Sequence, residues 1–121
     1  SNPGLKKIIL IKCNLGQAGI NILSSSLSNR TEDTLEELNL SDNNFGDIDL
    51  DELALTLNRG KALRSLQLNN NGIGLKGCVS LARLLRSQES NVEWLYLGRN
   101  SIDNDSAIIL ADSLKNNTKL K

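Results

Sequence analysis

The chain has 121 residues, which is enough for one domain with its own core but too little for two ordinary domains. Its 14 Lys and Arg residues balance its 14 Asp and Glu residues, so no net charge favours non-specific binding to nucleic acid or to an anionic membrane. Aromatic residues make up only 2% of the chain. The composition therefore favours a core built from many similar aliphatic contacts.

The sequence contains no apolar stretch long enough to span a bilayer. Cys13 and Cys78 lie far apart in unlike sequence contexts, so we expect two reduced, structural thiols and no disulfide framework. Together with the charge balance, these features predict a cytoplasmic protein that binds neither nucleic acid nor a membrane.

One motif recurs along the chain with a constant internal spacing. Apolar residues occupy its first, fourth and sixth positions, Asn or Cys its ninth, and an apolar residue its eleventh. The copies are Leu5, Ile8, Leu10, Cys13 and Leu15; Leu35, Leu38, Leu40, Asn43 and Phe45; Leu63, Leu66, Leu68, Asn71 and Ile73; and Val92, Leu95, Leu97, Asn100 and Ile102. The spacing predicts repeats over residues 5–34, 35–62, 63–91 and 92–119, after a leader or cloning remnant at residues 1–4 and before the start of a further repeat at 120–121.

Each copy predicts a short strand followed by a helix. The apolar fourth and sixth positions alternate with the period of a strand, and the spacing then becomes helical, which predicts helices near residues 19–28, 49–58, 77–87 and 105–115. Units of this size cannot bury their apolar faces alone and must stack on one another. We therefore predict an α/β fold, a right-handed solenoid with parallel strands on its concave face and helices on its convex face.

A polar residue follows each predicted strand. The side-chain amides of Asn43, Asn71 and Asn100 are expected to bond backbone groups of their own turn and of the neighbouring repeat, whereas Cys13 offers only a weak donor in that place.

In the first three repeats a glycine directly follows the apolar eleventh position of the motif. At Gly16, Gly46 and Gly74 a tight bend is expected to require positive φ, and Asp103 replaces the glycine in the last repeat.

The run Leu-x-x-Leu-x-Leu-x-x-Asn-x-Ile-Gly-x-x-Gly-x-x-x-Leu-Ala-x-x-Leu is complete from Leu63 to Leu85. It resembles the ribonuclease-inhibitor subfamily of leucine-rich repeats, and the resemblance extends over residues 5–121. That subfamily includes ribonuclease inhibitors, NOD-like receptors, tropomodulin-type filament cappers and Ran GTPase-activating proteins. The resemblance implies a horseshoe used as a binding scaffold, but it does not identify what is bound.

In such a horseshoe the strand residues between the leucines face the concave side and stay exposed. These are Lys7, Ile9 and Ile11; Glu37, Asn39 and Ser41; Ser65, Gln67 and Asn69; and Trp94, Tyr96 and Gly98.

The last repeat carries the only Trp and the only Tyr of the chain on this face, and Arg99 follows. Trp and Tyr are often core residues, but Leu95 and Leu97 occupy the buried positions here and fix the phase. Trp, Tyr and Arg are enriched among binding hot spots. The predicted partner-binding residues are Trp94, Tyr96, Arg99, Gln67, Asn69, Glu37 and Asn39.

Two isoleucines, Ile9 and Ile11, fall on the same exposed set. Either a terminal repeat has diverged, or a partner or additional sequence covers them. Because no polar cap is recognisable at either end of the array, we expect a fragment of a longer array or a chain that associates with itself through its open ends.

Motifs that would support catalysis or ion binding are weak. The chain has no His, so a Ser-His or Cys-His nucleophile pair is excluded. Asp47, Asp49, Asp51 and Glu52 resemble the opening of a calcium loop, but the required Gly and the closing Glu are missing, and acidic residues at a helix start are explained by the helix dipole. No catalytic residue, metal or cofactor is expected.

The sequence thus predicts a non-enzymatic module that binds a protein or peptide through its concave sheet, as part of a larger protein. The polar connection at residues 28–34 is a secondary contact candidate. Two alternatives stay open: a GTPase-activating regulator of the Ran type, and a structural role in capping a filament.

Overall fold

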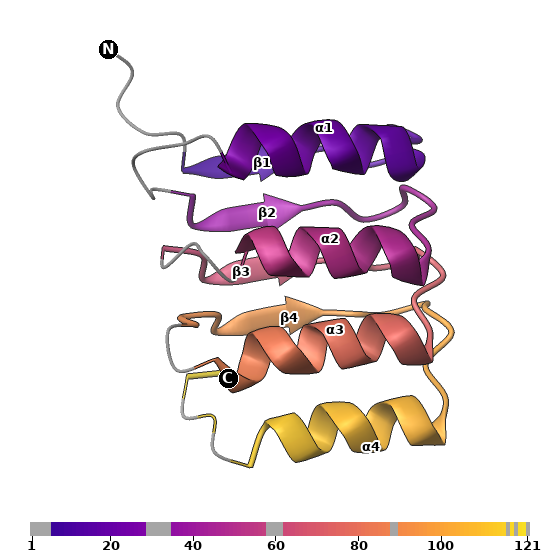
Figure 1. The fold of residues 1–121 in the computed structure, drawn as a ribbon, viewed down its shortest axis with the longest axis vertical. Coiled ribbons are helices and arrows are strands. Elements are labelled where there is room, and N and C mark those ends of the chain that lie inside the picture. Colours follow the sequence, from indigo (N-terminus) through magenta and orange to yellow (C-terminus); the bar gives the residue numbers. More distant parts are fainter. Residues whose placement is uncertain are drawn as a thin grey trace.

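The computed structural model describes residues 6–28, 35–57, 62–87, 90–115, 117, 119 and 120. Strands and helices alternate along them (Figure 1). The elements are β1 (Lys7–Ile9), α1 (Gly16–Ser28), β2 (Glu37–Asn39), α2 (Asp47–Leu57), β3 (Ser65–Gln67), α3 (Leu75–Arg86), β4 (Trp94–Tyr96) and α4 (Asn104–Ser113). The predicted leader, Leu5 and the connection between Ser28 and Leu35 lie outside the described residues.

The four strands form one parallel sheet in the order β1-β2-β3-β4. Their register aligns Ile8, Leu38, Leu66 and Leu95 in one row. Each crossover passes through a helix, and the helices stack in the same order in a layer of their own (Figure 1). The predicted α/β solenoid is confirmed.

The core lies between the sheet and the helix layer and is almost entirely aliphatic. Leu38 and Leu66 enter it from the strands, and Leu53 and Leu81 from the helices. The corresponding strand residues of the outer repeats, Ile8 and Leu95, are only partly buried.

Both cysteines are free thiols. Cys78 is buried in the core, and burial raises the pKa of its thiol, with a further contribution from the Asp47 carboxylate. Cys13 is exposed.

The helices begin earlier than the leucine pattern predicts, by three residues in α1, two in α2 and α3, and one in α4. The repeated leucines on which the prediction rests, Leu23, Leu53, Leu81 and Leu110, lie beyond the first turn of each helix, so the pattern places the helix starts too late. Helix α4 also ends at Ser113, two residues before the predicted end.

The polar residues that follow the strands form a continuous ladder of hydrogen bonds, as predicted. The Nδ2 of Asn71 donates to the carbonyls of Leu40 (3.0 Å) and Asn69 (3.2 Å). Its Oδ1 accepts from the backbone N–H of Asn43 at 2.8 Å. The next repeat continues the pattern, because Asn100 Oδ1 accepts from the N–H of Asn71 at 2.9 Å. Every rung thus joins one repeat to the preceding one.

At the first repeat the ladder ends in a cysteine. Asn43 Oδ1 accepts from the N–H of Cys13 at 2.8 Å, whereas the Cys13 thiol reaches only the carbonyl of Ile11, at 3.5 Å. The prediction of a weak donor at this position is confirmed.

Positive φ was predicted at Gly16, Gly46 and Gly74, and only Gly16 adopts it (57°). Gly74 has φ −119° and caps α3, and its N–H donates to Asp47 Oδ1 at 2.8 Å. The left-handed residues instead flank the ladder residue on both sides. They are Lys12 and Asn14, Asp42 and Asn44, Asn70 and Gly72, and Arg99 on the near side of the last rung.

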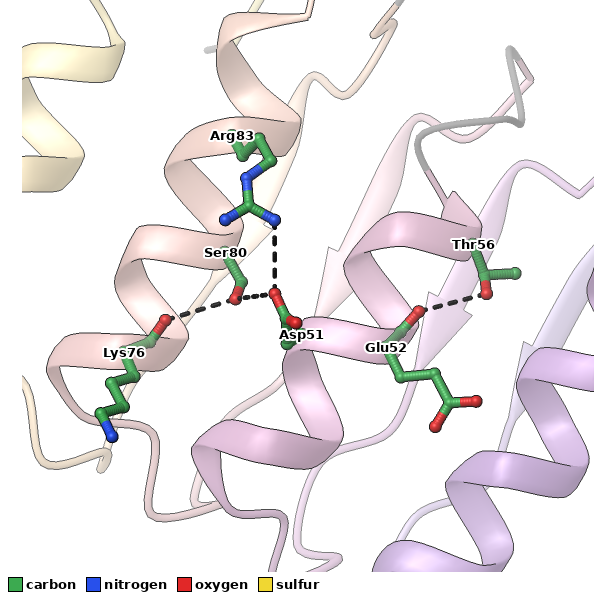
Figure 2. A network of polar contacts seen from close by, with 6 residues as sticks. All are labelled: Asp51, Glu52, Thr56, Lys76, Ser80 and Arg83. Atoms are coloured by element: carbon green, nitrogen blue, oxygen red, sulfur yellow. Dashed lines mark hydrogen bonds and ion pairs between the residues drawn. The ribbon is translucent and has the colours of Figure 1, made fainter.

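Two acidic residues at the start of α2 bond the next repeat. Asp47 Oδ1 accepts from the N–H of Gly74 at 2.8 Å. Asp51 Oδ1 accepts from the Ser80 hydroxyl at 2.9 Å and pairs with Arg83 at 3.4 Å (Figure 2). Of the carboxylates that resembled a calcium loop, those of Asp47 and Asp51 therefore bond the neighbouring repeat, and among the described residues no group of three potential metal ligands occurs.

Replacing Asn71 with Ala tests the ladder. The substitution removes the side-chain acceptor of the buried backbone N–H groups of Asn43 and Phe45, so we expect the free energy of unfolding to fall by about 2–4 kcal/mol. Urea denaturation followed by circular dichroism measures it. Asn104→Ala, at the exposed first position of α4, is the control and should change stability by less than about 0.5 kcal/mol. Equal midpoints for the two variants would contradict the role of the ladder.

The N-cap of α4 predicts a pH dependence. Asp103 accepts from the backbone N–H (2.9 Å) and the hydroxyl (2.8 Å) of Ser106, and these bonds, the backbone one first, lower the pKa of Asp103. A carboxyl with a lowered folded-state pKa stabilises the fold above its unfolded pKa of about 3.9, and loses that contribution as the pH falls through the folded value.

Asp103→Asn keeps a good cap but does not titrate. Its melting temperature should therefore fall less than that of the wild type when the pH is lowered through the acid range. Thermal melts in a series of buffers measure the difference, and parallel curves for the two proteins would show that Asp103 makes no pH-linked contribution.

Candidate protein-binding surface

The face of the sheet opposite the helices is called the sheet face here. Its residues lie in two rows across the strands, with Lys7, Glu37, Ser65 and Trp94 in one and Ile9, Asn39, Gln67 and Tyr96 in the other. Most of these side chains are exposed or partly exposed, and among the described residues no helix or strand covers them (Figure 1). The leucine phase therefore predicted the exposed columns correctly.

Trp94 and Tyr96 lie on the last strand with 45% and 44% of their surface exposed. Their neighbours across the sheet on β3 are Ser65 and Gln67. The intervening Leu95 packs against the core, so the two rings share the sheet face, as predicted.

Two amides of the predicted site are held by the backbone. Asn69 Oδ1 accepts from the N–H of Gly98 at 2.6 Å, and Asn39 Oδ1 accepts from the N–H of Ser41 at 3.1 Å. Fixing the oxygen of each amide leaves its Nδ2 as a donor that has no acceptor among the described residues. Both side chains thus offer a donor on the strands next to the aromatic pair, Asn69 just after β3 and Asn39 on β2.

Ser41 was predicted to be exposed, and this is wrong, because only 6% of its surface is exposed. Its hydroxyl accepts from the N–H of Asn69 at 3.1 Å while its own N–H is held by Asn39. The Ser41 hydroxyl thus bonds the backbone of the next repeat and does not face solvent.

Glu37 is exposed but already paired, since its carboxylate lies 3.3 Å from the ammonium of Lys7 on β1. Ion pairs at this level of exposure contribute about 0–1 kcal/mol. A ligand that uses Glu37 would therefore have to separate it from Lys7.

Arg99 directly follows Gly98 at the end of the aromatic strand, and it is exposed. Arg64, Arg83 and Arg86 each pair with a carboxylate from a neighbouring repeat. Within the described ranges, by contrast, no acidic group lies within ion-pair distance of Arg99.

One row next to the site was not predicted. Lys12, Asp42, Asn70 and Arg99 each precede the ladder residue and share the left-handed conformation. Asn70 Nδ2 donates to Asp42 Oδ1 at 2.6 Å, so side chains in this row contact one another between repeats. Their constant position before each Asn or Cys was the signal available in the sequence.

Ile9 and Ile11 are exposed at the other end of the sheet face, as the phase predicted. In the part of the chain that the structure describes, no helix is long and apolar enough to cross a membrane.

Comparison with known proteins finds a matching family model and several relatives. Residues 33–58 and 62–82 match the family model described as Leucine Rich repeat. The ribonuclease inhibitor of Mus musculus is 36% identical over 117 residues, which cover 94% of this chain and 25% of that protein. The chain is a leucine-rich repeat protein of the ribonuclease-inhibitor-like type.

Another leucine-rich repeat protein also matches nearly the whole chain. The leucine-rich repeat-containing protein AAC1 of Dictyostelium discoideum is 32% identical over 123 residues, covering all of this chain and 15% of that protein. The chain therefore spans a quarter or less of the length of these relatives.

A solved structure shares the fold of this leucine-rich repeat chain. Leiomodin-1 Actin-Binding Site 2 superposes with a TM-score of 0.83 over 98% of this chain and 69% of that chain, at 20% identity. At this identity the similarity concerns the fold and not the residues of the sheet face.

Tryptophan fluorescence tests the exposure of the aromatic pair, because Trp94 is the only tryptophan. We expect red-shifted emission from the native chain and ready quenching by acrylamide, with little change on unfolding in urea. Tyr96→Ala should increase the quenching further if the rings shield one another. Blue-shifted native emission that acrylamide hardly quenches would place Trp94 inside the core.

Proposed function

We propose that this chain is a non-catalytic interaction module that captures a protein or peptide on its sheet face. The observation that carries the proposal is the pair Trp94 and Tyr96, which are the chain's only Trp and Tyr and lie almost half exposed on one strand. Exposing large rings on a stable scaffold is unfavourable in water, and a partner that covers them recovers this apolar area.

The residues around the rings support the same proposal. Gln67 on β3 is paired with Tyr96, Asn69 follows β3, and Asn39 on β2 is paired with Gln67, so these amides extend from the aromatic pair across the sheet face. Rings that bury apolar area, surrounded by side chains that can bond a partner's backbone, are the usual composition of a binding hot spot and its rim. Glu37, with its existing pair to Lys7, lies at the rim of the proposed footprint.

Affinity purification followed by mass spectrometry tests the proposal. We expect Trp94→Ala combined with Tyr96→Ala to remove partners that the wild type retains, because truncating one hot-spot residue costs about 2 kcal/mol or more, about thirtyfold in affinity. An untagged copy of the chain, expressed in the same cells, reports self-association.

The matched control is Leu55→Ala combined with Ile108→Ala. These aliphatic side chains are at least as exposed, 50% and 65%, but belong to α2 and α4 in the helix layer. The control should retain the partners. If the helix-layer variant loses them and the aromatic variant keeps them, the binding surface lies on the other side of the molecule.

A further inference from the structure

Three features of the sheet face indicate the chemistry of the partner. These are an exposed aromatic pair, amide donors without an acceptor among the described residues, and an arginine without a described carboxylate partner. Each feature restricts the chemistry of the ligand, and together they indicate one class of peptide segment.

The amide donors demand acceptors. Asn39 and Asn69 have their oxygens occupied by backbone N–H groups, so the Nδ2 of each is the group that remains to bond a ligand. The carbonyl oxygens of a helix or of a paired strand are already bonded. A segment in an extended or polyproline II conformation leaves its carbonyls free, and therefore matches these donors.

The arginine demands an anion. Of the described arginines, Arg64, Arg83 and Arg86 are neutralised by Glu93, Asp51 and Asp112 across a repeat boundary. Arg99 directly follows Gly98 in the last repeat, lies three residues after Tyr96 and is exposed, and no described carboxylate pairs with it. Guanidinium groups bind carboxylates through paired hydrogen bonds.

We propose that the bound partner is an extended acidic segment, in which an apolar residue packs on Trp94 and Tyr96 and a neighbouring Asp or Glu pairs with Arg99. The backbone carbonyls of the segment accept from Asn39 and Asn69. This inference rests on the proposed function and specifies its ligand.

The chain supplies its own matched substitutions at Arg99. This residue has φ 56°, and the equivalent residues of other repeats are Asp42 (61°) and Asn70 (58°). Arg99→Asp and Arg99→Asn therefore introduce residue types that already occupy the equivalent position, with the same positive φ, in other repeats of the chain. Lys12, with φ 57°, occupies the same position in the first repeat, so Lys12→Asp makes the same charge change at the far end of the sheet face.

Selection from a phage-displayed library of random peptides tests the inference. On the wild-type chain we expect enrichment of peptides with Asp or Glu next to an apolar residue. Arg99→Asp should shift the enrichment to Lys and Arg, Lys12→Asp should leave it acidic, and Trp94→Ala with Tyr96→Ala should abolish it.

Fluorescence polarisation with the most enriched peptide then measures the ion pair between Arg99 and the acidic residue of the peptide. Replacing its acidic residue by the corresponding amide should weaken binding to the wild type about fivefold at low salt. The same replacement should make no difference to Arg99→Asn.

The outcomes separate the two proposals. Enrichment that depends on Trp94 and Tyr96 but shows no acidic preference, or a preference that Arg99→Asp does not alter, overturns the acidic segment and leaves the interaction module intact. Absence of any enrichment overturns the claim that an extended segment is the ligand. Enrichment that survives the loss of both rings overturns the module as well.

Discussion

A buried side-chain amide at the end of each strand holds one repeat to the next, and the rest of the structure depends on it. Asn71 and Asn100 each accept a backbone N–H of the preceding repeat and donate back to one of its carbonyls. A buried backbone group left without a partner is costly. The ladder therefore fixes both the spacing of the repeats and the register of their strands.

Register is what turns a repeat into a binding surface. Because side chains alternate along a strand, a slip of one residue would exchange the leucines of the core for the polar residues of the sheet face. With the register held, Leu95 points inward and Trp94 and Tyr96 point outward. The helices contribute from the other side, where Asp51 of α2 bonds Ser80 of α3 (Figure 2).

The leucine spacing alone predicted the strands, the solenoid, the ladder and the exposed rings, because each follows from a local period. It failed where a neighbouring repeat decides the outcome. Ser41 is held by the side chain of Asn39 and the backbone N–H of Asn69 in the next repeat. Gly74 has a negative φ, and its N–H bonds Asp47 of the preceding repeat. The helix starts were predicted late for a different reason, since the repeated leucines begin only after the first turn of each helix. The sequence thus predicted the fold better than it predicted which charged residues of the site are paired, because the pairing depends on contacts between arginines and carboxylates of different repeats.

The central claim is that one phase, set by the leucines and held by the asparagines, defines the surface on which a partner binds. Hydroxyl-radical footprinting of the chain, free and bound to the partner recovered by affinity purification, tests it most directly. The account predicts that Trp94 and Tyr96 lose their labelling on binding while Leu55 of α2 and Ile108 of α4 keep theirs. Protection of the two helix residues, with the aromatic pair still labelled, would contradict it.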